Sequence, residues 1–205
     1  MGDRALVVDL PDAEAVRRLA ATLRADLPTG VLDVVPGARS LLLRTAHATD
    51  LAPLARVVRA ATEAPNDSKA LARNDSGSSA EVVVDVRYDG ADLAEVARRT
   101  GLSVHEVVAA HTAADWRVAF MGFAPGFGYL VGDDPRLVAP RREHPRREVP
   151  AGSVALAGEY SGVYPRETPG GWQLIGSTDA PLWDLGNDPP ALLRPGLRVR
   201  FRDMR

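Results

Sequence analysis

Residues 122–130 read GFAPGFGYL, and these nine positions hold three glycines, one proline and three aromatic side chains. Aromatic residues make up 5% of the whole chain, so this stretch concentrates a scarce residue type. Glycine permits left-handed dihedrals and close backbone approach, whereas proline fixes its own dihedral and removes a donor. The stretch therefore predicts a shaped loop lined by aromatic side chains.

The sequence around this loop is strand-like and interrupted by proline and glycine. The apolar runs are residues 82–88 (VVVDVRY), 116–121 (WRVAFM), 153–158 (SVALAG), 162–165 (GVYP), 172–176 (WQLIG) and 196–201 (GLRVRF). Short strands separated by turn signals are typical of a β-barrel or sandwich. Between the first two runs we expect two helices, each opened by a capping box, Asp92 with Glu95 and Ser103 with Glu106.

The N-terminal part alternates strand and helix signals. Residues 5–10, 31–35 and 40–43 are strand candidates, and apolar residues at helical spacing follow residue 12 and residue 50. This order, β-α-β-β-α, predicts a small two-layer α/β domain that resembles a ferredoxin-like half. From residue 63 to residue 79 the sequence EAPNDSKALARNDSGSS loses its periodicity and is typical of a linker. We therefore predict an α+β protein with domains at 1–75 and 80–205.

Composition excludes several classes of protein. The chain has 205 residues, 45% of them hydrophobic, a formal charge of −2 and no cysteine. No basic run marks a nucleic-acid partner, and the missing thiols exclude disulfides and thiolate metal sites while fitting a reducing compartment. The N-terminal residues carry early acids and a short apolar run, typical of neither a secretory signal nor a membrane span. We expect a cytoplasmic protein without a membrane partner.

Histidine and arginine are the candidate polar residues. The four histidines, His47, His105, His111 and His144, lack metal-ligand spacing. His111 lies near the end of its predicted helix. We expect it either to cap the C-terminus of that helix as a cation, or to act as an acid, a base or a hydrogen-bonding contact to substrate.

The segment 140–150, PRREHPRREVP, carries four arginines among three prolines. It is either a solvated loop with its own ion pairs or a stiff strip that holds an anion. Downstream, Ser153 fits a turn serine better than a nucleophile, because the G-x-S-x-G pattern is absent. The sequence also lacks a Gly-rich loop that ends in a lysine, which is the pattern that would predict a phosphate-binding loop.

Taken together, these motifs are recognisable. They are residues 101–111 (GLSVHEVVAAH), 122–130, 140–158 (PRREHPRREVPAGSVALAG), 162–165, 168–178 (TPGGWQLIGST) and 189–201 (PPALLRPGLRVRF). In this order they resemble the 5-oxoprolinase B-subunit family, also described as allophanate hydrolase subunit 1. That family includes a sporulation-kinase inhibitor and a domain of urea carboxylase. The resemblance covers residues 82–201, and more loosely residues 31–43.

The resemblance implies a small α/β N-terminal domain and a cyclophilin-like β-barrel. It also implies the B subunit of an ATP-dependent complex that converts 5-oxo-L-proline to L-glutamate, together with an A subunit and a homologous barrel, the C subunit. ATP with magnesium is then bound in the assembled complex and not by this chain, which is inactive alone. The same motifs are compatible with a module that inhibits a histidine kinase and with a component related to allophanate hydrolase or urea carboxylase.

With this resemblance in view, we expect two groups of site residues. The expected catalytic residues are His111, Arg141 and Arg146. The residues expected to bind a small-molecule substrate or a partner are Phe123, Pro125, Phe127, Tyr129, Ser153 and Tyr164. This chain departs from the family pattern at two places. Residues 159–161 are Glu-Tyr-Ser where the family tends to carry Asn-Gln-Thr, and residue 177 is serine where the family tends to carry arginine. These differences bear on which substrate is held.

Overall fold

The computed structural model describes residues 4–46, 49–63 and 81–204, and the chain divides into two compact units, Met1–Ser78 and Ser79–Arg205. The expected linker lies outside the described residues except for Glu63, which ends a helix. His47 also lies outside them. The domain limits 1–75 and 80–205 stay a prediction. In the part of the chain that the structure describes, no helix has the length and apolarity needed to cross a membrane.

The first unit has the element order β-α-β-β-α that the periodicity predicts. Its elements are β1 (Ala5–Asp9), α1 (Ala13–Ala25), β2 (Val31–Pro36), β3 (Ser40–Thr45) and α2 (Leu51–Glu63). The strands form an antiparallel sheet in the order β1-β3-β2. Leu41 and Leu43 on β3 are fully buried, and α1 packs Val16, Leu19 and Leu23 into the same core. The name ferredoxin-like stays a prediction.

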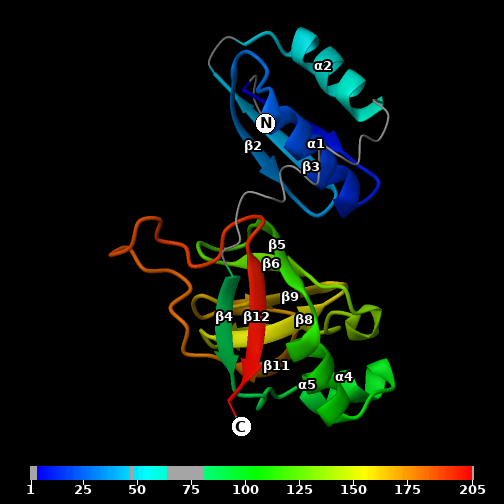
Figure 1. Cartoon of the computed structure of the whole chain (residues 1–205), viewed down its shortest axis with the longest axis vertical. Helices are drawn as coiled ribbons and strands as arrows, with labels where there is room; N and C mark the ends of the chain where they lie inside the picture. Colours follow the sequence, from blue (N-terminus) through cyan, green and yellow to red (C-terminus); the bar gives the residue numbers. More distant parts are fainter. Residues whose placement is uncertain (1–3, 47–48, 64–80, 205) are drawn as a thin grey trace. The chain divides into compact units, whose positions relative to one another are not determined.

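The second unit is a barrel-like sheet accompanied by the α-helices α4 and α5 (Figure 1). Its elements are β4 (Glu81–Val86), α4 (Leu93–Thr100), α5 (Val104–Ala113), β5 (Trp116–Met121), β6 (Gly128–Val131), the 3-10 helix η2 (Pro135–Leu137), β7 (Arg146–Val149), β8 (Ser153–Ala157), β9 (Tyr160–Val163), β10 (Thr168–Gly170), β11 (Gln173–Ser177) and β12 (Arg198–Asp203). Seven strands form one sheet in the order β11-β8-β9-β6-β5-β12-β4, and β7 pairs with β10 in a separate two-stranded sheet.

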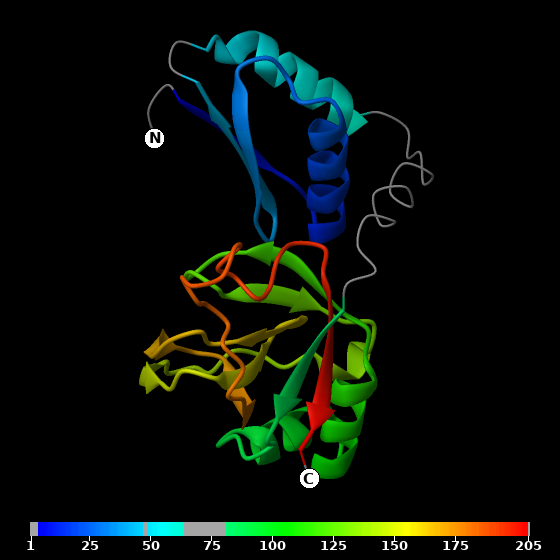
Figure 2. The same cartoon turned by 60° about the vertical axis from the view of Figure 1, so that its left-hand side comes forward.

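Two features close this sheet on itself. The outer strand β4 runs parallel to β12, so a segment from the start of the unit lies beside its last strand (Figure 2). Just beyond β4, Arg87 exchanges two backbone hydrogen bonds of 2.8 Å with Ser177 at the end of β11. Because β4 and β11 are the two edges of the sheet, this bridge brings them together, and the sheet is nearly closed and barrel-like.

The helix starts show where local sequence signals succeed and fail. Ser103 and Glu106 form the predicted capping box at the start of α5, and Gly101 ends α4 in the left-handed conformation with φ of 72°. The box predicted for Asp92 and Glu95 was wrong. Asp92 precedes α4 without a side-chain cap bond, and Glu95 instead accepts hydrogen bonds from Arg98 and Arg99.

Candidate functional site

The barrel unit contains a pocket of about 500 Å³ whose walls are largely aromatic. Six rings line it, those of Phe123, Phe127, Tyr129, Tyr160, Tyr164 and Trp172, and the one charged side chain of the lining is that of Arg141. The rings come from the loop of residues 122–127, from β6, from β9 and from the segment that links β9 to β11. Binding pockets of small molecules combine apolar walls with a few placed polar groups in this way.

The loop of residues 122–127 presents one wall of the pocket. The Ala124 N–H donates to the Gly122 carbonyl at 2.7 Å, and the Phe127 N–H donates to the Ala124 carbonyl at 3.0 Å. The first bond makes a γ-turn centred on Phe123, and the second closes a four-residue turn from Ala124 to Phe127. Phe123 has a φ of 67° and is the single described non-glycine residue with positive φ. Such backbone strain persists where the surroundings impose it, and here it leaves the Phe123 side chain 58% exposed at the pocket.

Phe127 anchors the aromatic walls. Its ring centroid lies 5.3 Å from that of Phe123, 5.1 Å from that of Tyr129, 5.4 Å from that of Tyr164 and 5.3 Å from that of Trp172. All four pairs are edge-to-face, the arrangement that the ring quadrupole favours. The Phe127 ring is itself buried. The walls are therefore a fixed set of rings that present their faces and edges to the pocket.

Arg141 supplies the positive charge of the pocket. Its side chain is exposed, and none of the ion pairs among the described residues involves it. Burial raises the pKa values of the Tyr129 and Tyr164 hydroxyls, and the charge of Arg141 opposes the rise at both. Both phenols thus stay protonated near neutral pH and can donate hydrogen bonds beside a guanidinium. This combination suits a ligand that carries a carboxylate.

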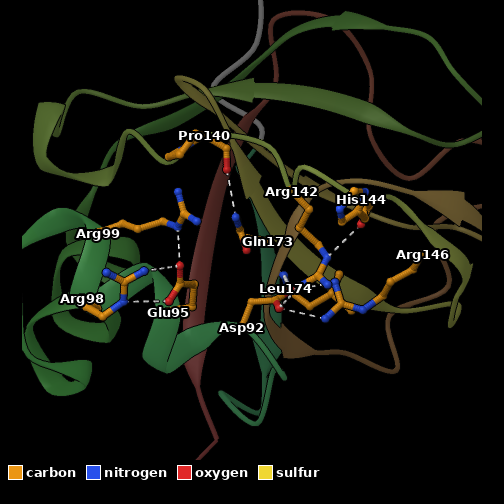
Figure 3. A network of polar contacts seen from close by, with 10 residues as sticks. All are labelled: Asp92, Glu95, Arg98, Arg99, Pro140, Arg142, His144, Arg146, Gln173 and Leu174. Atoms are coloured by element: carbon orange, nitrogen blue, oxygen red, sulfur yellow. Dashed lines mark hydrogen bonds and ion pairs between the residues drawn. The ribbon is translucent and has the colours of Figure 1, made fainter.

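Two other arginines of the segment 140–150 bind a carboxylate of the protein (Figure 3). Arg142 Nη1 donates to Asp92 Oδ1 at 2.7 Å. Arg146 donates through Nη1 to Asp92 Oδ2 and through Nη2 to Asp92 Oδ1, both at 2.8 Å. The Leu174 backbone N–H donates to Asp92 Oδ2, also at 2.8 Å. The segment is therefore neither a free solvated loop nor an open strip of anion-binding arginines.

Asp92 is buried and ionised. Its burial would by itself raise its pKa, but the hydrogen bonds from Arg146 and the Leu174 backbone, with the charges of Arg146 and Arg142, outweigh this and hold the pKa below its usual value. A buried carboxylate is tolerated when charged partners and an N–H satisfy its oxygens, as they do here. Asp92 is thus a fixed negative charge at neutral pH.

His111 lies in a closed environment and does not line the pocket. Its side chain has no exposed surface, Nδ1 lies 2.8 Å from Tyr88 Oη, and Nε2 lies 2.9 Å from Ser161 Oγ. Complete burial lowers its pKa to about 3, so the imidazole is neutral at physiological pH. The expectation of a cationic helix cap was therefore wrong. A neutral imidazole with both nitrogens engaged is well suited to joining α5 to β9.

Two further predicted residues lie elsewhere. Ser153 is buried at the start of β8, where its hydroxyl donates to the Pro150 carbonyl at 2.8 Å, as a turn serine does. Pro125 lines a second, more open hollow of about 440 Å³, which Trp183 and Phe123 also line. Among residues 4–46, 49–63 and 81–204, no cluster of three or more histidine, cysteine, aspartate or glutamate side chains is arranged to hold a metal ion.

The structure thus divides the predicted site residues. It brings Arg141 together with Phe123, Phe127, Tyr129 and Tyr164. The other four, His111, Arg146, Pro125 and Ser153, do not line this pocket. Sequence reasoning missed Asp92, which it treated as a helix cap, and it did not place Trp172, a buried residue of a hydrophobic cluster, in the wall of the pocket. Trp172 follows a double glycine next to the recognised Tyr-Pro motif, a signal that could have placed it in the wall.

Comparisons with known proteins agree with the resemblance. A family model described as carboxyltransferase domain, subdomain C and D, matches residues 1–193. The 5-oxoprolinase B subunit of Escherichia coli O157:H7 is 42% identical over 199 residues, which are 95% of this chain and 87% of that protein. The crystal structure of TTHA0988 superposes with a TM-score of 0.75 at 38% identity.

The structural matches differ in how much of the other protein they span. The match to TTHA0988 covers 98% of this chain but 40% of that one. The urea carboxylase of Kluyveromyces lactis superposes with a TM-score of 0.72 over 21% of its length, and at 18% identity this shows a shared fold alone. The sequence match over nearly the whole chain carries the assignment. The chain belongs to the carboxyltransferase subdomain C and D family and, within it, to the B subunits of 5-oxoprolinase.

Proposed function

We propose that this chain is the B subunit of an ATP-dependent 5-oxoprolinase, which opens the lactam of 5-oxo-L-proline to give L-glutamate. The observation that carries the proposal is an aromatic pocket with a single guanidinium, Arg141, in a chain closely related to a 5-oxoprolinase B subunit. The partners in this proposal are the A subunit and the homologous barrel, the C subunit. The absence of cysteine fits a reducing compartment, and we place the protein in the cytoplasm.

The pocket matches the chemistry of 5-oxo-L-proline. This substrate is a small, nearly flat ring with one carboxylate and one lactam. The faces and edges of Phe127 and Tyr164 can bury the ring, and Arg141 can pair with the carboxylate through two N–H groups. The protonated Tyr129 hydroxyl remains available to donate to a substrate oxygen. In this arrangement the chain binds and orients the substrate and shields it from water.

The pocket and the residues that the structure describes do not have the composition of a site for magnesium and ATP. Arg141 is the one cation that lines the pocket, and the described residues contain no acidic cluster of metal-binding geometry. The sequence has no Gly-rich phosphate loop with a lysine, Lys69 being its one lysine. ATP, which supplies phosphoryl activation of a stable amide carbonyl, is therefore assigned to the partner proteins of the complex. No step of the reaction is assigned to it within this chain.

Of the three predicted catalytic residues, Arg141 alone is assigned contact with substrate. His111 is buried, neutral and bonded at both nitrogens, so it is assigned to the scaffold. Arg146 is occupied by Asp92 and is likewise assigned a supporting role. These assignments replace the expectation that all three act on the substrate.

Reconstitution tests the proposal. The chain alone should show no ATP hydrolysis that depends on 5-oxo-L-proline, whereas the complex with the A and C subunits should hydrolyse ATP and release L-glutamate. Arg141→Ala should assemble normally and raise KM for 5-oxo-L-proline. Turnover by the isolated chain would contradict the partner requirement. Inhibition of a histidine kinase, or turnover of a urea-derived substrate in place of 5-oxo-L-proline, would replace the proposed activity.

A further inference from the structure

We propose that Asp92, which lies outside the pocket, is a positioning residue that holds Arg141 at the pocket through residues 140–146, here called the strap. The inference rests on the proposed function only for the identity of the ligand. The geometry of the strap stands by itself, because every contact that defines it is made within the barrel unit.

The strap is fixed on both sides of Arg141. On one side, Gln173 Nε2 donates to the Pro140 carbonyl at 2.9 Å. On the other side, the Arg142 backbone N–H donates to the Gly171 carbonyl at 2.8 Å. Because both neighbours of Arg141 are held, its backbone has little freedom while its side chain stays exposed. Figure 3 shows Gln173 reaching Pro140, and Arg142 and Arg146 converging on Asp92.

Asp92 is the anchor that holds the arginine end of the strap. Its side chain is 5% exposed and accepts four hydrogen bonds, one from Arg142, two from Arg146 and one from the Leu174 N–H. The Asp92 backbone N–H donates in turn to the Leu174 carbonyl at 2.9 Å. The carboxylate is therefore tied to β11, which follows Trp172 in the pocket wall. Asp92 therefore attaches both the strap and the strand that continues this wall.

The negative charge of Asp92 matters more than its shape. Three arginines, Arg141, Arg142 and Arg146, lie within the strap, and the carboxylate of Asp92 pairs with two of them and offsets one of their positive charges. With a neutral side chain at position 92, Arg142 and Arg146 would repel each other and Arg141, and would lose their charge-assisted bonds. The side chains of Arg142 and Arg146 would then turn toward solvent, and the arginine end of the strap would lose its attachment to β11. Arg141 would leave its place beside Tyr129 and Tyr164.

A positioning role predicts effects that a purely structural role does not. If Asp92 acts through Arg141, then Asp92→Asn should weaken substrate binding about tenfold, while Asp92→Asn in an Arg141→Ala background should add little. KM should rise more than kcat falls, because the anion contact is uniform binding. A structural role would lower the melting temperature and leave affinity in the folded fraction unchanged.

The experiment combines calorimetry with hydrogen exchange on the assembled complex. Binding of 5-oxo-L-proline is measured for the wild type, Asp92→Asn, Arg141→Ala and the double variant, and exchange is followed in peptides covering residues 139–147. Asp85→Asn is the matched control, since Asp85 binds Arg202 in a bidentate pair at the surface. We expect faster exchange of the strap in Asp92→Asn, unchanged exchange in the control, and a double variant no weaker than Arg141→Ala.

Each outcome decides the inference. Additive losses in the double variant, or strap exchange equal to wild type in Asp92→Asn, would overturn it. If Asp92→Asn does not fold, Arg146→Gln removes one arm of the anchor, keeps Arg142, and is held to the same two criteria. If the wild-type complex binds no 5-oxo-L-proline, the proposed function fails, and the exchange measurement alone then supports or overturns the anchoring of the strap.

Discussion

Two groups of aromatic rings in the barrel unit have opposite characters. Six rings line an open pocket beside Arg141, whereas Tyr88, Trp116 and Phe201 enclose His111. Phe123 in the first group is 58% exposed, while His111 in the second has no exposed surface. The same kinds of side chain therefore build a binding wall in one place and a sealed core in the other.

The difference shows where this unit can keep a charge. In the closed group, burial removes the charge of His111 and lowers its pKa to about 3. In the open group, the exposed side chain of Arg141 presents its guanidinium to the pocket and to solvent. A contact with an anionic substrate needs the second environment. Substitutions in the two groups should therefore separate stability from binding.

The largest effect is expected at His111. His111→Ala should lower the free energy of unfolding by about 3–5 kcal/mol, because it opens a cavity and leaves the Tyr88 and Ser161 hydroxyls without their partner. Urea unfolding of the variant measures this loss. The exposed His144 is the matched control, and His144→Ala should change stability by less than about 0.5 kcal/mol. Equal stability of the two variants would show that the group around His111 is not a sealed core.

A pH titration of stability should give an effect of similar size from the same side chain. The folded state keeps His111 neutral down to a pKa of about 3, whereas the unfolded chain binds a proton near the ordinary value of 6.5. The stability is therefore full above pH 6.5 and falls as the pH drops toward 3, by about 1.4 kcal/mol per unit from this group. Unfolding free energies measured at a series of pH values should show this slope in the wild type. His111→Gln should lack that contribution, and an unchanged slope would refute it.

Arg141→Ala should have a smaller effect, and the effect should be on substrate binding and not on stability. Because the side chain is exposed and makes no ion pair among the described residues, stability should change by less than about 1 kcal/mol. Loss of the contact to the substrate carboxylate should weaken binding about tenfold or more, which is roughly 1.4 kcal/mol. Arg136→Ala, which removes an arginine paired with Asp134, serves as the control for both measurements. A normal affinity of Arg141→Ala would place the anion contact elsewhere.

The smallest effect is expected at Phe123, where strain and ring contacts oppose each other. Position 123 has a φ of 67°, which costs a residue with a Cβ roughly 1–2 kcal/mol and glycine little. Both Phe123→Gly and Phe123→Ala lose the ring contacts with Phe127 and Tyr164, but only the first relieves the strain. Phe123→Gly should therefore be about 1 kcal/mol more stable than Phe123→Ala by thermal unfolding. The reverse order would mean that the γ-turn is not retained in solution.

Local patterns predicted much of this molecule. Alternation and turn residues indicated the barrel strands, and helical spacing indicated α1. The clustered glycines and aromatics of residues 122–130 indicated a shaped aromatic loop, although residues 128–130 belong to β6. Each of these signals is contained in a short window of sequence. The Ser103–Glu106 capping box was likewise confirmed.

What the sequence could not show depends on distant partners. Asp92 fits the spacing of a capping box, but its partners Arg142, Arg146 and Leu174 lie 50, 54 and 82 residues further along the chain. His111 is near the end of a helix, and its neutrality follows from its burial beside Tyr88 and Ser161, 23 and 50 residues away. Charge state and availability for binding are set by this packing. Residue type and local spacing do not determine them.

The most direct test of the account is a crystal structure of the complex with 5-oxo-L-proline bound. We predict the carboxylate of the ligand within hydrogen-bond distance of the Arg141 guanidinium, the ring among Phe127, Tyr129 and Tyr164, and no contact with His111. A ligand seated outside this pocket, or one in contact with the His111 imidazole, would contradict the division between an open binding group and a sealed core.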